Sequence, residues 1–290
     1  MKITVTSACT DCQRSHHHVL RFVRAPQDIM QPSLAELRQQ PHTSISATKT
    51  FLQCPRKYRL QYIDRARPEF RSAALVLGSA WHDTIDEWLL ADHAEPEALR
   101  AHLRDGLTRR LRDDDVLFDE EDEDEGRLVD VAVRMLGVFL TKVPKPDGTI
   151  GVEVPFSLEL GHPVTGEILP VRVIGALDAV VLKKGTEFIW ELKTAKRKWG
   201  QDQIEFDLQT TMYKVAARAL GFGDADVEVL VTLKWARPDV QVERLVRHRR
   251  DEVELAETFF SVHCAVDAGV DHPIRGWMCR TCPFAGACGS

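Results

Sequence analysis

Long apolar runs are missing from this 290-residue chain, and no segment approaches the roughly 18 consecutive apolar residues of a membrane-spanning helix. The first residues, from Met1 onward, also lack the apolar stretch of a secretory signal peptide. No Gly-x4-Gly-Lys-Ser/Thr sequence occurs, so the chain carries no P-loop and is not itself a helicase. We therefore expect a cytoplasmic globular protein with no membrane partner.

An excess of positive charge is also missing. The formal net charge is −6, whereas proteins that passively coat nucleic acid are usually basic. Much of the negative charge lies in the segment 113–125, where ten of thirteen residues are acidic. This density of like charge is typical of a solvated or disordered loop. The alternative is a segment that mimics DNA and gates the active site. The rest of the chain is slightly basic, so a local basic groove for DNA remains compatible with the composition.

The apolar pattern changes its period along the chain. Before about residue 148 it is mainly helical, and from residue 150 it alternates with the period of two that is typical of strands. This order predicts an α/β core that carries a helical insertion. The expected helices cover 80–91, 96–112, 127–142, 203–220 and 252–268, and the expected strands cover 151–160, 171–182, 187–193 and 227–235.

The domain organisation that we expect is one large domain behind an N-terminal extension, since there is no internal repeat and no long linker. The extension covers 1–43 and the domain 44–290, with a helical and acidic insertion at about 83–148. In the extension, Cys9 and Cys12 precede three histidines. Their spacing is compatible with a small zinc site, although adjacent histidines cannot all face one metal.

A predicted hairpin gathers polar groups on one face. If its turn is centred between Lys184 and Gly185, Asp178 lies directly opposite Glu191, with Cβ atoms about 4.5–5.5 Å apart. Lys193 follows Glu191 by two residues and points to the same face. The opposite face receives residues suited to a buried core, which are Leu177, Ala179, Val181, Phe188, Trp190 and Leu192.

This constellation favours metal-dependent phosphodiester hydrolysis. Two carboxylates this close repel each other unless a cation lies between them, and Mg²⁺ and Mn²⁺ prefer such oxygen ligands. A metal bound there polarises a phosphoryl oxygen and lowers the pKa of a bound water. Lys193 is suited to orient that water or to stabilise charge that develops on the phosphate. The ordinary alternative is a surface salt bridge among the three side chains.

Residues at helical spacing flank the hairpin on both sides. His82 lies on a predicted helix, and Gln209 and Tyr213, four residues apart, share one face of a later helix. Taken singly, a helical histidine is usually packed or solvated, and a Gln–Tyr pair is unremarkable. In chain order the motifs are Gly78-x3-His82, Gly175-x2-Asp178, Glu191-Leu192-Lys193 and Gln209-x3-Tyr213.

This ordered set resembles the PD-(D/E)XK nuclease superfamily. More narrowly, it resembles the RecB-type branch, which includes the nuclease domains of RecBCD and AddAB and the CRISPR adaptation nuclease. The segment from Ser44 to Tyr58 is also similar to that branch, and the resemblance spans roughly 44–288. It implies a restriction-endonuclease-like core, with a central mixed sheet flanked by helices. One departure is Leu177, which stands where the motif has proline.

The resemblance also implies roles for the motif residues. The divalent cation, Mg²⁺ or Mn²⁺, would be bound by His82, Asp178, Glu191 and the carbonyl of Leu192. Lys193 would be catalytic together with the two carboxylates. Gln209 and Tyr213 would support the site and contact DNA.

A second metal site is indicated by cysteines near the C-terminus. Cys279-x2-Cys282-x5-Cys288 argues for metal binding on spacing alone, and soft thiolates select zinc or an iron–sulfur cluster. Spacing does not identify the fourth ligand. The resemblance supplies it, because the iron–sulfur-containing relatives have one cysteine before the nuclease motifs, which matches Cys54. We therefore favour a 4Fe–4S cluster over tetrahedral zinc, with the physical role of tying the tail to an early helix.

The function expected from these features is a metal-dependent DNA exonuclease that acts on single strands or DNA ends. A helicase or a recombination, repair, phage or CRISPR component is an expected partner. The alternative is a non-catalytic DNA-binding or assembly subunit of a larger complex, held together by the same cysteines. Basic residues interleaved with aromatics suit single-stranded DNA. The candidate DNA contacts are Arg56, Lys57, Tyr58, Lys196 and Trp199.

Overall fold

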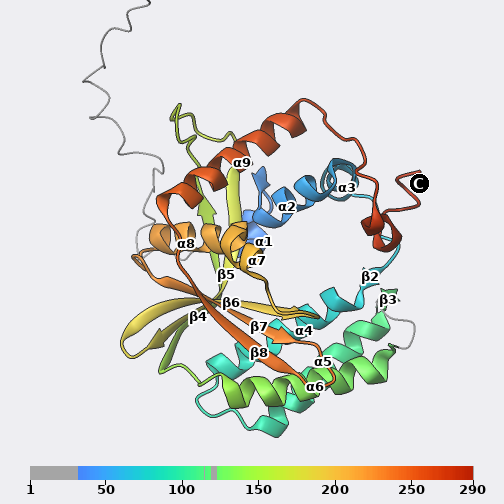
Figure 1. Ribbon diagram of the computed structural model, residues 1–290, viewed down its shortest axis with the longest axis vertical. Coiled ribbons are helices and arrows are strands. Elements are labelled where there is room, and N and C mark those ends of the chain that lie inside the picture. Colours follow the sequence, from blue (N-terminus) through green and yellow to red (C-terminus); the bar gives the residue numbers. More distant parts are fainter. Residues whose placement is uncertain (1–31, 114, 119–122, 290) are drawn as a thin grey trace, which may run out of the picture.

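A computed structural model describes residues 32–113, 115–118 and 123–289 of the chain (Figure 1). Its centre is a mixed six-stranded sheet in the order β1-β5-β6-β7-β8, with β4 paired to β5 as well. The sheet strands are β1 (His42–Thr43), β4 (Gly148–Leu158), β5 (Arg172–Lys183), β6 (Thr186–Ala195), β7 (Asp226–Leu233) and β8 (Asp239–Leu245). β4 lies along one edge of β5, whereas β1 and β6 share the other edge.

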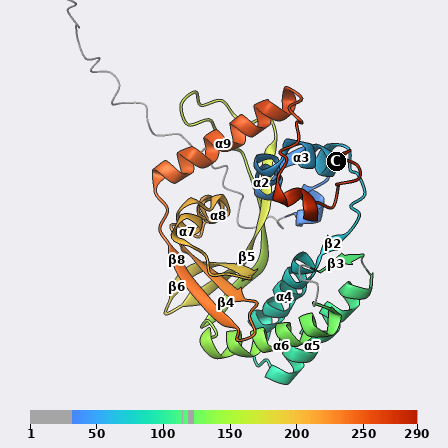
Figure 2. The same ribbon diagram turned by 45° about the vertical axis from the view of Figure 1, so that its right-hand side comes forward.

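Helices cover both faces of the sheet, as the views in Figures 1 and 2 show. One face packs against α4 (Ala73–Leu90), α5 (Pro96–Asp113) and α6 (Glu125–Lys142), and the other against α8 (Leu208–Leu220) and α9 (Arg249–Asp267). The helical insertion is therefore one wall of the core. The predicted apolar face of the hairpin packs into this wall, except for Leu177, which joins the cluster beneath α8 and α9. Leu177 lies beyond the last β5–β6 ladder pair, although it still pairs with Val154 of β4.

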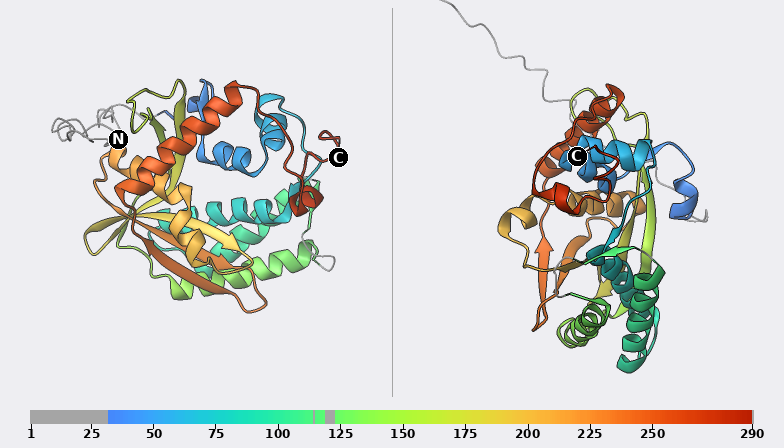
Figure 3. Two further views of the ribbon diagram at one scale, coloured as in Figure 1. Left: turned by 45° about the horizontal axis from the view of Figure 1, so that its top comes forward. Right: turned by 90° about the vertical axis from the view of Figure 1, so that its right-hand side faces the viewer.

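The early helices, within residues 34–63, form a layer at the β1 end of the sheet (Figure 1). Figure 3 shows the C-terminal tail that follows α9 lying beside the early helices, and the Arg56 N–H donates to the His272 carbonyl at 3.3 Å. No helix within the described part of the chain is both long and apolar enough to cross a membrane. The elements of this layer and the short connectors are α1 (Leu34–Leu37), α2 (Ile45–Gln53), α3 (Pro55–Tyr58), the π-helix η1 (Arg59–Ile63), β2 (Arg71–Ser72), β3 (Val116–Leu117), α7 (Gln201–Phe206) and the 3₁₀ helix η2 (Trp277–Thr281).

Three expectations about elements need correction. The helix expected over 203–220 breaks at Asp207, whose carboxylate accepts from the Thr210 N–H at 2.9 Å and starts a new helix there. Strand β8 was not expected from the sequence, because Pro238 directly precedes its short alternation of apolar and polar residues. It forms the edge of the sheet beside β7. The acidic segment is not one loop, since Val116 and Leu117 pair with β2 and Asp124 caps α6.

Candidate metal-dependent catalytic site

The β5–β6 hairpin has the register that the sequence predicts. The ladder runs from Lys183–Thr186 to Ala179–Trp190, which confirms the register, and the next opposed residues are Asp178 and Glu191. β7 pairs with the other edge of β6 over residues 188–195, past the point where the β5–β6 ladder ends. In place of a further ladder bond, the Leu192 N–H donates to Oδ2 of Asp178 at 2.8 Å.

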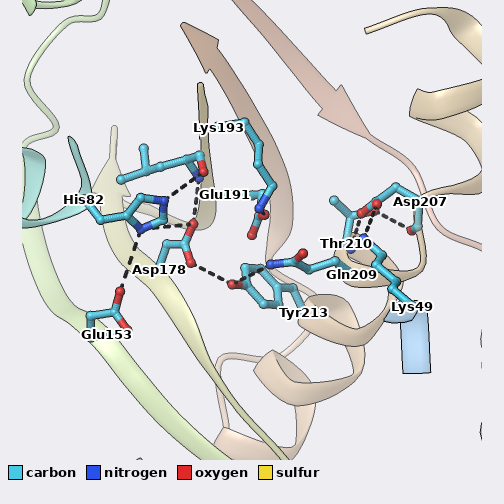
Figure 4. Close-up of polar contacts among 11 residues, drawn as sticks. Lys49, His82, Glu153, Asp178, Glu191, Lys193, Asp207, Gln209, Thr210 and Tyr213 are labelled. Atoms are coloured by element: carbon cyan, nitrogen blue, oxygen red, sulfur yellow. Dashed lines mark hydrogen bonds and ion pairs between the residues drawn. The ribbon is translucent and has the colours of Figure 1, made fainter. Parts of the chain in front are cut away.

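Asp178 is held by the protein on both of its oxygens (Figure 4). While Oδ2 accepts from Leu192, Oδ1 accepts from the Tyr213 hydroxyl at 2.7 Å. Nε2 of Gln209 lies 3.3 Å from the same hydroxyl and donates to it. Burial raises the pKa of Tyr213 well above its ordinary value, and Glu191 and Asp178 raise it further. Tyr213 therefore remains a hydrogen-bond donor, and α8 orients Asp178 through it.

Glu191 is placed very differently. Glu191 is 0% exposed, and neither of its carboxylate oxygens makes a hydrogen bond to any described residue. The Lys193 ammonium forms an ion pair with its Oε1. Burial raises the pKa of Glu191 to about 7, Asp178 adds to the rise and Lys193 opposes it. Burial lowers the pKa of Lys193, but Glu191 and Asp178 outweigh it and leave that pKa above its ordinary value. A buried carboxylate without hydrogen bonds is costly, so the arrangement is suited to receive a cation.

His82 lies between the carboxylates and the backbone of β6. Its Nδ1 is 3.7 Å from Glu153 Oε1 and 3.9 Å from Asp178 Oδ2, and its Nε2 is 3.1 Å from the Leu192 carbonyl oxygen. Burial lowers the pKa of His82, but Glu153 and Asp178 outweigh it and raise the pKa to about 9. The local potential therefore favours positive charge at this point.

The group of possible ligands that the described residues bring together is His82, Glu153 and Asp178, whose ligand atoms lie within 4.8 Å of one another. The sequence predicts Glu191 as a ligand beside His82 and Asp178, and it does not point to Glu153. Glu153 lies on β4 with a left-handed backbone (φ 46°), between the pairs Val152–Ala179 and Val154–Leu177. Its position follows from the β4–β5 register, and no hairpin signal specifies that register across the long connection 159–171.

A further acidic residue, Asp86, was also missed. It follows His82 by four residues on α4, a spacing that places both on one helix face and is visible in the sequence. Its Oδ1 is buried without a hydrogen bond to any described residue. Burial raises its pKa to about 7, and Glu153 adds to the rise.

Supporting residues explain parts of the motifs. A Cβ at Gly175 would lie 2.5 Å from the Phe156 ring, so a larger residue there would displace β4 side chains beside the site. On the opposite side, the Lys49 ammonium pairs with Asp207 at 2.7 Å, which ties α2 to the start of α8 (Figure 4). This ion pair fixes the helix that carries Gln209 and Tyr213.

The predicted ligands Cys54, Cys279, Cys282 and Cys288 line one small cavity, but among the described residues their sulfur atoms do not come close enough together to form a metal-holding group. Cys54 lies at the junction of α2 and α3, and its Sγ accepts from the Ile274 N–H at 3.4 Å. The walls between the thiols are apolar apart from Lys57 and Arg275. The lining cysteines are Cys54, Cys279, Cys282 and Cys288. Cys9 and Cys12, the candidate zinc ligands, lie outside the described residues.

The candidate DNA contacts do not gather at the carboxylates. Arg56 pairs with Asp271 at 3.4 Å, Lys57 lines the cysteine cavity, and Tyr58 packs on Phe51 and Tyr62. Lys196 is exposed near the end of β6. Trp199 is only 9% exposed and packs in a small core with Val229 and Val231, so its ring is covered and not open for base stacking.

Comparison with known proteins gives two kinds of match. The family model of the PD-(D/E)XK nuclease superfamily matches residues 42–289. The crystal structure of a "putative exonuclease" from Eubacterium rectale is similar with a TM-score of 0.55, at 15% identity over 87% of this chain and 92% of that one. A second structure, that of SSO0001, has a TM-score of 0.38 at 16% identity, over 85% of each chain. No curated protein matches the chain.

Proposed function

Because the chain belongs to the PD-(D/E)XK nuclease superfamily, a group of phosphodiester hydrolases, we propose that it is a divalent-metal DNA exonuclease that acts on single strands or DNA ends. The exonuclease activity is suggested by the name of the structurally similar protein from Eubacterium rectale. A helicase, recombination, repair, phage or CRISPR component is the kind of partner we propose, in line with the RecB-type motifs.

The observation that carries the proposal is the fully buried carboxylate of Glu191, which has the Lys193 ammonium beside it but accepts no hydrogen bond from the described residues, next to a set of further possible ligands. His82 Nε2 lies 3.1 Å from the Leu192 carbonyl oxygen and its Nδ1 lies 3.9 Å from Asp178 Oδ2, so three of the residues that would hold the cation are close together. We propose that His82, Asp178, Glu191 and the Leu192 carbonyl hold Mg²⁺ or Mn²⁺, and that Glu153 lies close enough to join them. When bound, the cation supplies a Lewis acid for the phosphoryl oxygen and a more acidic water.

The chain's own residues carry out the remaining tasks. Lys193, kept protonated by Glu191 and Asp178, places positive charge where negative charge grows on the phosphate. Tyr213 and Gln209 keep Asp178 in one orientation, so that its geometry does not change when substrate arrives. Packing of α4 against β6 excludes water from behind the carboxylates.

For the cysteine cavity we propose a 4Fe–4S cluster, with tetrahedral zinc as the alternative. Support comes from four thiols around one apolar cavity, with Lys57 and Arg275 nearby to offset thiolate charge. The tail is also bound to the segment before α4, since the Glu69 N–H donates to the Pro283 carbonyl at 2.8 Å and Gly286 donates to Glu69 Oε1 at 2.7 Å. The cluster would stabilise the approach to the helix that carries His82.

The test is cleavage of end-labelled single- and double-stranded DNA with Mg²⁺, Mn²⁺ or chelator, for the wild type and Lys193→Ala. The matched control is Lys142→Ala on α6, whose ammonium pairs with Asp239 away from the site. We expect metal-dependent cleavage by the wild type and the control, lost in Lys193→Ala. Equal products from all three would reject catalysis by this site and leave the non-catalytic DNA-binding subunit.

A further inference from the structure

One edge of β5 has a gap in its pairing. On this edge β1 pairs with Arg172 and Val173, whereas the β6 ladder reaches only to Ala179. A cavity of about 460 Å³ adjoins the gap, and residues 174–176 form part of its wall. Helices α1 and α2 both contact β5 beside this gap (Figure 1). We call this space the β5-edge cavity.

The β5-edge cavity is continuous with the catalytic site. Glu153, Gln209 and Tyr213, all part of the polar cluster around Asp178, also line the cavity. Its volume lies within the range of small-molecule sites, roughly 300–1,000 Å³. A ligand inside it would therefore lie next to the scissile phosphodiester.

The other lining side chains suit an anion. Arg38 is exposed and makes no ion pair with any residue in the described ranges, and it follows α1 directly. His42 Nδ1 lies 2.7 Å from the Gln40 carbonyl, which leaves Nε2 available to a ligand. Glu153 is the one carboxylate among the lining residues, and it belongs to the catalytic cluster. The cavity thus combines the Glu153 carboxylate, which belongs to the catalytic cluster, with the Arg38 guanidinium, which is suited to pair with a phosphate of the substrate strand.

An aromatic platform completes the lining. The Tyr62 ring is half-buried and held against Tyr58, with ring centroids 5.1 Å apart. Base stacking on aromatic rings is independent of base identity and requires an unpaired base. Ser46, also in the lining, adds an exposed hydroxyl.

From this combination we propose that the β5-edge cavity binds one unpaired nucleotide of the substrate strand, next to the scissile bond. The base stacks on Tyr62, and its phosphate pairs with Arg38. This inference rests on the proposed nuclease function and adds that the strand must be single at this point.

The test measures binding separately from cleavage. A short fluorescein-labelled oligothymidylate is titrated in chelator by anisotropy, over a series of salt concentrations. The variants are Tyr62→Leu and Arg38→Ala, with Tyr62→Phe as the rescue and Arg104→Ala, exposed on α5 outside the cavity, as the charge-matched control. Thermal melting verifies that each variant is folded.

We expect Tyr62→Leu to weaken binding about 5- to 100-fold, and Tyr62→Phe to restore it. Arg38→Ala should lower the slope of log K against log salt by about 0.7, while Arg104→Ala leaves it unchanged. Wild-type affinity and slope in both cavity variants would overturn the inference. If the wild type binds in this way yet never cleaves with metal, the nuclease function fails and the cavity assignment stands. If it cleaves while the cavity variants bind normally, only the cavity assignment fails.

Discussion

Asp178 and Glu191 lie opposite each other on one hairpin, yet the protein treats them in opposite ways. Asp178 accepts hydrogen bonds on both oxygens, from the Leu192 N–H and the Tyr213 hydroxyl. Glu191 is fully buried and accepts none from the described residues, and Lys193 is its charged neighbour. The first carboxylate is oriented by the fold, and the second is left for a cation. Asp178 should therefore contribute to both stability and function, and Glu191 chiefly to function.

The largest effect that separates these roles is on activity. Glu191→Gln keeps the shape of the side chain but removes its charge, so we expect the single-turnover rate constant of cleavage to fall by about 10³-fold or more with folding intact. Single-turnover cleavage of labelled DNA, with circular dichroism as the folding control, measures it. Retention of more than a tenth of the activity would mean that Glu191 is not part of the catalytic machinery.

In stability, the substitution of Asp178 should have a larger effect than the substitution of Glu191. Asp178→Ala leaves the Leu192 N–H and the Tyr213 hydroxyl without acceptors, which should cost about 2–4 kcal/mol of unfolding free energy. Glu191→Gln removes a fully buried charge but also the partner of the Lys193 ammonium, and because these two effects oppose each other its net loss should be smaller than that of Asp178→Ala. Urea unfolding in chelator compares the two. Equal losses would erase the contrast between the two carboxylates.

Tyr213→Phe tests whether the orientation of Asp178 by its hydrogen bonds matters for function. It removes one donor to the carboxylate and keeps the ring in its core position, so metal affinity or activity should fall about 10- to 100-fold. Cleavage measured against Mn²⁺ concentration separates the two effects. A matched Tyr58→Phe variant, whose ring packs beside Tyr62, should leave the metal dependence unchanged.

The last effect is on the pH dependence of stability without metal. The pKa of Glu191 rises from its ordinary 4.5 to about 7 on folding, so its contribution to stability is present below about pH 4.5 and is lost as the pH rises through 7. Glu191→Gln should flatten this part of the stability profile. An identical profile in both proteins would show that Glu191 does not titrate as its burial requires.

The sequence predicted local geometry better than long-range assembly. The hairpin register followed from a turn between Lys184 and Gly185 and from strict alternation, both of which act over neighbouring residues. Gln209 and Tyr213 were found because helical spacing brings them together. Glu153 was missed because its position depends on a register across a long connection.

Burial was the other property that sequence could not provide. Trp199, flanked by basic residues, suggested DNA contact, yet β7 and β8 cover it. Strand β8 itself was missed, so nothing in the pattern indicated a core at that point. The four cysteines line one cavity, and Cys54 was included among them only because a family resemblance supplied it, but the cluster itself stays a prediction.

The most direct measurement is the change in melting temperature on addition of Mn²⁺ to metal-free protein, for the wild type and Glu191→Gln. Binding to the folded state alone stabilises it, by about 2.7 kcal/mol when the metal is at a hundred times its Kd. The account predicts a clear rise in melting temperature for the wild type, reversed by chelator and largely absent in Glu191→Gln. An equal rise in both proteins would contradict it, because the buried carboxylate would then not be the one that awaits the cation.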